Sequence, residues 1–480
     1  MRALRLVLPL LLFVVAGLAG CASQDAGPGG PDPFDQAEQA IGEPRDDGGV
    51  VAGAPDSVNL ERLVALTGED GRTPPPGEGY VETAVKGGYA YLCRTGPEQG
   101  LVVFDVHDIE HPRYTGFVTL HAGFEADIEV SDDGQWAFWE TQRAYLSTPP
   151  VPPSTDPAAN APHGIHVVDL SDKTAPTWVS FTPILPDGPH SITYANISGE
   201  HYVFASAYAY AYVSQGVAVP GLQRLVILHL DTSGPTPRLV QVAEYMDPDA
   251  AEESPKVEDG QKFPHDVAFQ YHPLTRQPLA YVAYWDLGVV ILDVSDPAHP
   301  VKVGQASDFG ETPYADIHMA RPFPHLIAGR HVTVTEPEIS GQEDTGYYTF
   351  FDTTDPTKPV YLSRWKIPGN GTSGGAGGGG PHYFDANFGR IVTAHYGAGF
   401  WVADVHDATN LLRPRTTAYA MPKPGVGDSL PGPLGAFTGG SAFDAWWADP
   451  THVIASESSS GLVVFRYTGP APEPVTTADS

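Results

Sequence analysis

The sequence predicts an all-β protein folded as a seven-bladed β-propeller, and three observations predict it. A short motif recurs seven times, at intervals of roughly sixty residues, along most of the 480-residue chain. Short runs rich in Val, Ile, Tyr and Phe alternate with Gly, Asp and Pro, which is typical of strands and turns. No segment after residue 20 has a convincing helical period. Repeats of this length without helices indicate blades placed radially round a channel.

The motif is an apolar run of four or five residues, a polar residue, and a short turn with proline. The clearest copies are GLVVFDVHDIEHP (100–112) and GVVILDVSDPAHP (288–300). The residues that close the apolar runs are Asp105, Asp169, His229, Asp293, Asp352, Asp404 and Arg466.

The fourth repeat shows the internal order most clearly. Strands are expected at 263–269, 279–285, 288–294 and 301–307, with turn residues between them. Four consecutive short strands that pair with their neighbours in the chain form an antiparallel blade. The other repeats follow the same order.

The last repeat predicts how the ring closes. It begins near Ser441 and runs into a proline-rich tail without a clear fourth strand, whereas the strand expected at 58–66 has no repeat of its own. That strand can complete the seventh blade and remove an exposed sheet edge. The propeller is therefore expected to span 58–469, followed by a disordered tail at 470–480.

The N-terminus has the pattern of a secretory signal at 1–20. Arg2 and Arg5 precede an apolar run at 6–16, which is too short to cross a bilayer. The sequence Leu18-Ala19-Gly20-Cys21 then resembles a bacterial lipobox; the alternative is an ordinary signal peptide with an incidental cysteine. This resemblance implies a diacylglycerol anchor on Cys21, a flexible tether at 21–57, and an outer-membrane lipoprotein in the bacterial cell envelope, periplasmic or surface-exposed.

Charge and cysteine content exclude several classes of function. The chain has 26 basic and 58 acidic residues and a formal charge of −32, which argues against nucleic-acid partners. Two cysteines cannot build a disulfide framework. Cys93 lies in a strand-like run, so we expect a buried, inert thiol.

The motif also carries a family resemblance. GLVVFDVHD, GVVILDVSDP and GLVVFRYTG resemble the LVIVD repeat of bacterial β-propeller surface proteins. The resemblance covers about residues 58–469 and implies a propeller, but no particular reaction. The third, fifth and seventh copies depart from the pattern, with His229, the aromatic run 347–351 and Arg466.

Long insertions gather on one face of the predicted ring. They occur in loops between second and third strands and between blades, which share that face, at 143–162, 207–223, 246–262, 336–346, 369–380 and 421–440. Collected insertions usually mark a binding face. No serine-hydrolase, HExxH, Walker or dinucleotide motif is present. The first interpretation is therefore a non-enzymatic binding or scaffolding module for an envelope protein, a peptide or a glycan.

Histidines on the same face suggest a second interpretation. Pro-His pairs open three inner strands at one aligned position, His190, His265 and His382, and His318 and His395 are expected to face the same mouth. Converging imidazoles could hold copper or zinc and support a metal-binding protein or metalloenzyme. The alternative is that the histidines are part of the repeat consensus and lock neighbouring blades together. The sequence makes no cofactor certain.

Aromatic residues on this face are candidate ligand contacts. Tyr208, Tyr210 and Tyr212 alternate with Ala, and Trp285-Asp286 closes a second strand. Aromatic rings beside acidic groups suit sugars or peptides. The alternation is equally that of a strand that buries one aromatic face.

Overall fold

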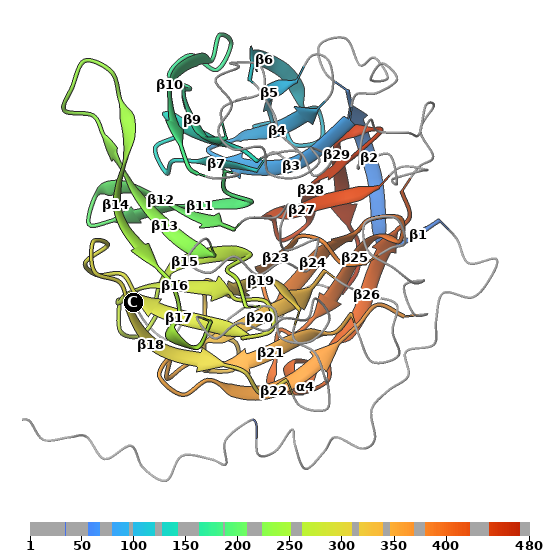
Figure 1. Cartoon of the computed structure of the whole chain (residues 1–480). Coiled ribbons are helices and arrows are strands. Elements are labelled where there is room, and N and C mark those ends of the chain that lie inside the picture. Colours follow the sequence, from blue (N-terminus) through green and yellow to red (C-terminus); the bar gives the residue numbers. More distant parts are fainter. Residues whose placement is uncertain are drawn as a thin grey trace, which may run out of the picture.

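Twenty-nine strands form seven antiparallel sheets placed round a ring (Figure 1). The computed structural model describes residues 34, 56–67, 79–95, 99–120, 127–142, 163–185, 188–208, 223–250, 262–309, 316–338, 346–368, 380–422 and 441–470. The predicted seven-bladed propeller is confirmed.

The first four blades each contain four strands in chain order from the channel outward. Blade one is β3 (Gly79–Lys86), β4 (Tyr89–Thr95), β5 (Gly100–Asp105) and β6 (Arg113–Thr119). Blade two is β7 (Ile128–Val130), β8 (Trp136–Thr141), β9 (Gly164–Asp169) and β10 (Thr177–Pro183). Blade three is β11 (Ser191–Ile197), β12 (Glu200–Ala207), β13 (Arg224–Asp231) and β14 (Arg238–Tyr245), followed by the 3₁₀ turn η1 (Pro248–Ala250). Blade four is β15 (Asp266–Tyr271), β16 (Pro278–Ala283), β17 (Val289–Asp293) and β18 (Val301–Ala306).

The remaining blades complete the ring. Blade five is β19 (Ile317–Pro322), β20 (Val332–Pro337), β21 (Tyr348–Asp352) and β22 (Val360–Trp365). Blade six is β23 (Phe384–Asn387), β24 (Arg390–His395), β25 (Gly399–Asp404) and β26 (Arg415–Ala420), with β1 (Ser57–Val58) at its outer edge. Helix α4 (Ala408–Leu412) lies between its last two strands. Blade seven is β27 (Ala442–Asp449), β28 (His452–Glu457), β29 (Gly461–Tyr467) and β2 (Leu60–Leu66).

The repeat seen in the sequence reappears as a repeated irregularity. In every blade the pairing between the third and fourth strands shifts register once, from Val103/Phe104 in blade one to Arg62/Val64 in blade seven. A bulge of this kind bends the strand and increases its twist. The predicted third strand at 288–294 is observed as β17, and the first strand begins at Asp266. His265 therefore precedes the strand instead of lying within it.

The N-terminal strand closes the ring as predicted, with one difference. Strand β2 pairs antiparallel with β29, from Leu60 opposite Tyr467 to Leu66 opposite Leu462. The expected strand at 58–66 is divided, because Asn59 adopts a left-handed conformation with φ of 54°. Residues before Asn59 pair with β26 of blade six, so this segment joins both blades.

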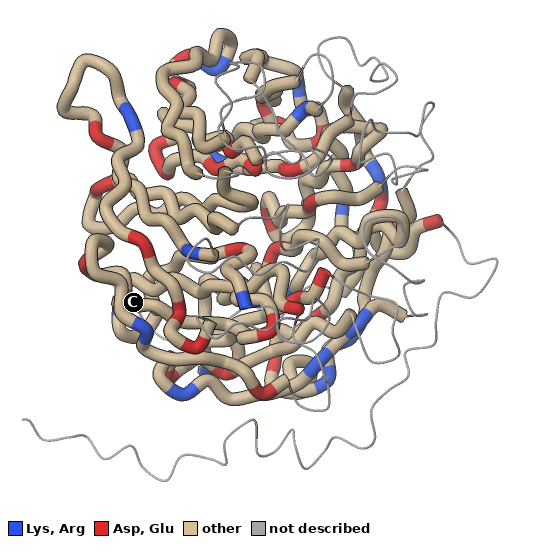
Figure 2. The backbone as a smooth tube through the Cα atoms, viewed as in Figure 1, with Lys and Arg blue, Asp and Glu red and all other residues tan. Residues whose placement is uncertain are grey.

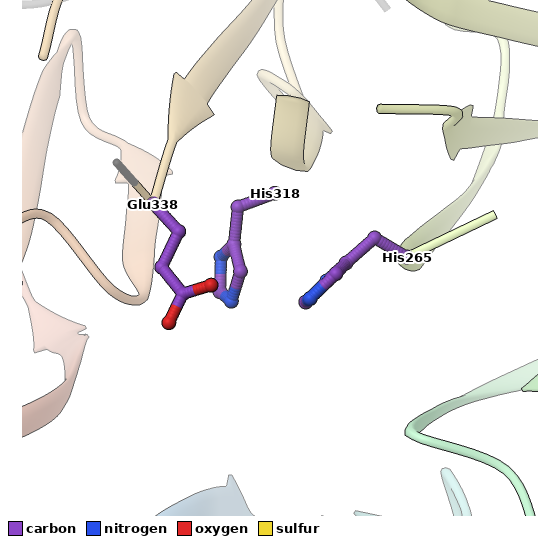
Figure 3. A group of neighbouring side chains, drawn as sticks. All are labelled: His265, His318 and Glu338. Carbon is purple, nitrogen blue, oxygen red and sulfur yellow. The ribbon is translucent and has the colours of Figure 1, made fainter. Parts of the chain in front are cut away.

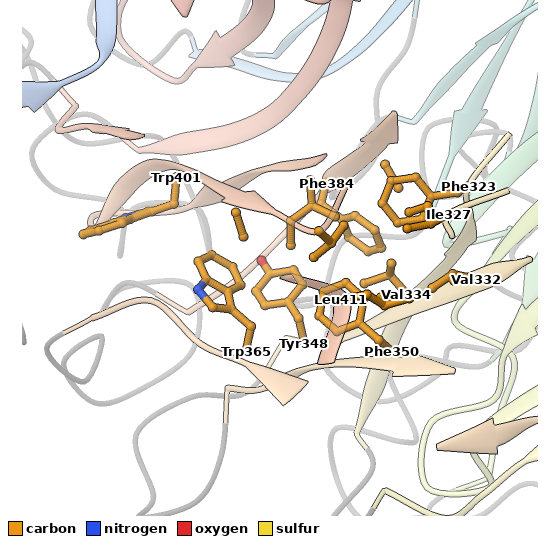
Figure 4. Close-up of a cluster of buried hydrophobic side chains, with 14 of the residues drawn as sticks. Phe323, Ile327, Val332, Val334, Tyr348, Phe350, Trp365, Phe384, Trp401 and Leu411 are labelled. Carbon is orange, nitrogen blue, oxygen red and sulfur yellow. The ribbon is translucent and has the colours of Figure 1, made fainter. Parts of the chain in front are cut away.

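The hydrophobic core lies between the blades. Seven clusters of buried apolar side chains each join two neighbouring blades. Figure 4 shows the cluster between blades five and six, where Val334 and Phe350 face Phe384. Phe34 lies within the expected tether, yet it is buried in this cluster with the Arg330 guanidinium carbon 4.2 Å from its ring centre.

The structure also bears on the predictions about Cys93, the charge and the chain termini. Cys93 is buried as expected, and burial raises the pKa of its thiol well above the usual value. Acidic positions, including several near the centre of the ring, outnumber basic ones in Figure 2. None of the helices in the described ranges has the length and apolarity to span a bilayer. The predicted signal sequence, Cys21, most of the predicted tether and residues 471–480 lie outside the described residues.

Candidate metal centre at one mouth of the channel

Four histidines occupy the start of four consecutive inner strands. His190, His265 and His382 stand just before β11, β15 and β23, and His318 is the second residue of β19. Blades three to six therefore each contribute one imidazole. Because inner strands of a propeller run in the same direction, these side chains gather at one mouth of the channel.

The four rings form a continuous arc. Ring centres lie 4.5 Å apart between His190 and His265, 4.3 Å between His265 and His318, and 5.0 Å between His318 and His382. Blade six is not next to blade three or blade four in the ring. His318 of blade five fills the gap, so the cluster does not depend on reaching across the channel.

A carboxylate completes the group. Glu338 follows β20, and one ligand atom each from His265, His318 and Glu338 lie within 4.8 Å of one another. Figure 3 shows these three side chains converging on one point. Nitrogen and oxygen ligands lie about 2.0–2.2 Å from zinc, so two ligands of one ion are separated by up to about 4 Å. Small rotations would bring all three to that spacing.

Hydrogen bonds to the Nδ1 atoms fix the orientation of three of the rings. His190 Nδ1 lies 2.9 Å from Gln142 Oε1, and His318 Nδ1 lies 2.7 Å from Glu336 Oε1. His382 Nδ1 lies 2.8 Å from the main-chain oxygen of Phe443. Oxygen acceptors of this kind typically bind the second nitrogen of a metal-ligating histidine. The His382 bond also joins blade six to blade seven, so ligand orientation and blade locking occur together at this residue.

His265 is different, because its Nδ1 is buried without a hydrogen-bond partner among the described residues. A hydrogen bond of the ring with the main chain of His318 opposes the lowering of the pKa of His265, while Nδ1 itself has no partner. A buried polar atom left without a partner costs about 1–3 kcal/mol. Such an atom in a native structure indicates an absent ligand or a functional constraint.

Burial keeps the imidazoles neutral. It lowers the pKa of His190 to about 3 and that of His382 to about 4, and it holds the pKa values of His265 and His318 well below the usual value. The neighbouring histidines reinforce the shift at His190, His265 and His318. Neutral imidazole is the form that binds metal, so the cluster needs to lose no protons at neutral pH. Burial also raises the pKa of Glu338, which the Tyr396 hydroxyl opposes by donating to Oε1 at 3.1 Å.

Strained backbone surrounds the cluster. Trp285, Asp316 and Tyr396 have positive φ angles of 43°, 39° and 28°. The Trp285 ring lies 5.2 Å from His265, and the Tyr396 ring lies 4.7 Å from His382. Positive φ in residues with a Cβ is costly and concentrates at functional sites.

The remaining predicted site residues fall into four groups. Tyr208 and Trp285 pack with Phe263 beside the cluster, and the Tyr208 ring lies 5.0 Å from His190. Asp286 hydrogen bonds Asp316, whose pKa burial raises to about 7. Tyr210 and Tyr212 lie outside the part of the chain that the structure describes. His395 ends β24, and its Nε2 lies 3.0 Å from the Tyr348 hydroxyl.

The sequence interpretation missed the acidic and amide partners. Glu338, Glu336 and Gln142 lie at the ends of second strands, where the large insertions begin. Glu336 is the penultimate residue of β20 and Glu338 directly follows the strand, and this alternation at a strand end could have placed them near the same mouth as the histidines. Gln142 offered no comparable signal, because a single amide at a strand end is common.

Comparisons with known proteins support the repeat. Residues 279–308, which contain β17, β18 and most of β16, match the LVIVD repeat. No curated protein matches the chain. A protein of unknown function from Desulfotomaculum acetoxidans DSM 771 is similar in structure, with 13% identity, a TM-score of 0.45, and coverage of 71% of this chain and 85% of that one. A candidate 6-phosphogluconolactonase from Bacteroides fragilis NCTC 9343 has 11% identity and a TM-score of 0.46, with coverage of 79% and 86%.

Proposed function

We propose that this seven-bladed propeller, which carries the LVIVD repeat, binds a transition-metal ion at the mouth of its channel. One observation carries the proposal: ligand atoms of His265, His318 and Glu338 lie within 4.8 Å of one another, with His190 and His382 packed on either side. Imidazole ligands suit copper and zinc, the two metals that the histidines suggested, as well as iron and nickel.

The protein groups around the cluster have separate roles in this proposal. Neutral imidazoles supply the lone pairs, and Glu338 supplies the negative charge. Gln142, Glu336 and the Phe443 carbonyl fix the orientation of three rings through their Nδ1 atoms. A bound ion would supply Lewis-acid or redox chemistry to a ligand that reaches the same mouth.

Equilibrium metal content tests the proposal. The full-length chain is stripped with a chelator, equilibrated with Cu²⁺ or Zn²⁺, and analysed by mass spectrometry for metal per chain. We expect about one ion per chain, lost in His318→Ala. His299→Ala is the matched control, because His299 lies in an exposed turn beside Asp296. A folded wild-type chain that retains neither metal would refute the proposal.

The long insertions of the sequence also suit a binding module. We propose that it acts in the bacterial envelope, held by lipid on Cys21, with an envelope protein, peptide or glycan as its partner. The lipobox-like sequence Leu18–Cys21 supports the anchor. Incorporation of labelled fatty acid into the wild type but not into Cys21→Ser tests it.

A further inference from the structure

A cavity of about 300 Å³ occupies the channel next to the histidine cluster. All seven blades contribute residues from their inner strands or from positions just before them. A second cavity of about 350 Å³ shares Glu129, Tyr194 and Trp446 with the first and reaches Lys86 and Asp132, beside the turns of the opposite face. The two cavities are therefore adjacent, and together they extend from the opposite face into the channel; we refer to the pair as the passage.

This passage ends against the histidine cluster. Tyr383 lines the first cavity, and its ring lies 4.6 Å from His382 and 5.2 Å from His318. Glu82 also lines it, with Oε1 3.9 Å from His382 Nδ1. Asp266, a third lining residue, follows His265 directly in the chain.

The lining of the first cavity is strongly acidic. It has a single basic side chain, Arg321, among the described residues. The acidic side chains are Glu82, Asp127, Glu129, Asp266, Asp385 and Asp444. A cleft lined by one sign of charge and enclosed by protein concentrates ions of the opposite sign. Burial raises the pKa of five of these carboxyls, to about 7 at Asp127, Asp266 and Asp444. The passage therefore favours cations when these carboxyls are ionised.

Bonds between blades hold three of the carboxylates in place. Main-chain N–H groups donate to carboxylates of the preceding blade, from Ile192 to Asp127 at 2.8 Å and from Trp447 to Asp385 at 3.1 Å. The Thr83 N–H donates to Asp444 at 3.1 Å, across the junction of blades seven and one. The acidic lining is thus part of the rigid ring.

Arg321 is held more weakly than its surroundings. Its Nη1 lies 3.3 Å from Asp385, and its guanidinium carbon lies 4.3 Å from the Trp446 ring centre. Its Nε is buried without a hydrogen-bond partner in the described ranges, and the same holds for the hydroxyl of Thr83, which also lines the cavity. Unpaired donors and acceptors at the wall of a cavity indicate a place for water or an ion.

We propose that this passage is the route by which a hydrated divalent metal cation reaches the histidine cluster from the opposite face, with Arg321 as its gate. The inference rests on the proposed metal-binding function. The carboxylates attract the cation. The Arg321 guanidinium lies among these carboxylates and blocks the passage until the cation displaces it. The mouth that bears the histidines then remains available to another ligand.

Rates of Co²⁺ binding test the route. The metal-free full-length chain is mixed with Co²⁺ in a stopped-flow instrument, and the visible spectrum of bound cobalt is followed. Burial raises the pKa of Glu129 well above its usual value, so the rates are compared over a series of pH values. Where Glu129 is ionised, we expect Glu129→Gln to lower the association rate about tenfold, because the field that attracts the ion is weakened, and we expect Arg321→Met to raise it. The dissociation rate should change by the same factor, so that the affinity stays constant.

Controls separate the route from the site. Asp296→Asn removes an exposed carboxylate from a turn on the same face, outside the passage, and should leave both rates unchanged. Glu129 makes none of the bonds between blades described above, so Glu129→Gln keeps the test valid if Arg321→Met does not fold. Normal rates in folded Glu129→Gln would overturn the route while leaving the metal site intact. Absence of Co²⁺ from the wild type at equilibrium would overturn both.

Discussion

The histidine mouth and the acidic middle of the channel use neighbouring positions of the repeat in different ways. At one end the histidines hold their Nδ1 atoms against oxygen acceptors or leave them unpaired. In the middle of the channel, Asp127 accepts main-chain N–H bonds with both oxygens, from Ile128 at 2.7 Å and Ile192 at 2.8 Å. The Asp127 carboxylate is bonded within the ring, whereas Nδ1 of His265 has no partner among the described residues.

This difference separates stability from binding. Substitution of a residue that hydrogen bonds the next blade should lower the free energy of unfolding and have little direct effect on metal affinity. Residues with an unpaired nitrogen should do the reverse, because natural proteins accept local instability where a ligand binds. The following variants test that division in order of the expected effect.

Asp444→Ala should have the largest effect on stability. The Asp444 carboxylate accepts from the Thr83 N–H at 3.1 Å, the Ala445 N–H at 2.7 Å and the Trp446 indole N–H at 2.8 Å. Removal leaves these donors without their acceptor at the junction of blades seven and one. We expect a loss of about 3 kcal/mol in the free energy of unfolding, measured by urea denaturation. A loss no larger than that of an exposed variant such as Asp108→Ala would contradict the assigned role.

Asp266→Asn should change how stability depends on pH. Burial raises the pKa of Asp266 to about 7 from 3.8, so the folded state binds a proton that the unfolded state has lost. The contribution of this group is complete below pH 3.8 and is lost as the pH rises through 7.

The variant lacks this loss. Between pH 5 and 8 its free energy of unfolding should therefore rise relative to the wild type by about 2 kcal/mol. Denaturation at several pH values measures the difference. Asp296→Asn should show no such difference between pH 5 and 8, because a hydrogen bond with His299 lowers the pKa of Asp296 from 3.8 and the carboxyl is ionised throughout this range. A pH-independent difference for Asp266→Asn would show that this carboxyl titrates normally.

Glu336→Gln should weaken metal binding while leaving all proposed ligands in place. Glu336 accepts from His318 Nδ1 at 2.7 Å and is fully buried. Loss of such a partner typically weakens metal affinity by at least about tenfold, measured by competition with a chromophoric chelator. Glu200→Gln is the matched control, because it alters an exposed pair with His229 at 2.9 Å. Equal metal affinities of Glu336→Gln and Glu200→Gln would show that Glu336 does not contribute to metal binding.

The fold could be predicted because its signal is repeated. Seven copies of an apolar run followed by a turn average out local departures such as His229 and Arg466. Closure by the N-terminal strand was predictable too, because blade seven lacked a strand and residues 58–66 lacked a repeat. The break at Asn59 was not, because it depends on a left-handed residue between two pairing partners.

The site could be predicted only where it follows the repeat. The aligned Pro-His pairs placed His190, His265 and His382 at one mouth, and His318 was recognised despite its three-residue offset. Glu338 lies beside a long insertion, whose geometry the repeat does not determine. The packing of His395 against Tyr348 depends on contact between blades five and six, which periodicity within one blade cannot show.

His265→Phe should have the smallest effect on stability, and it distinguishes metal binding from blade locking at this residue. The ring packs against Trp285 at 5.2 Å and His318 at 4.3 Å, so phenylalanine keeps the aromatic contacts and removes the unpaired Nδ1. Because a buried unpaired polar atom is destabilising, we expect the metal-free variant to gain about 1 kcal/mol in unfolding free energy. Metal binding should be lost at the same time. If His265 instead locked the blades, the variant would lose stability with and without metal. The division between the histidine mouth and the acidic middle of the channel would then not hold.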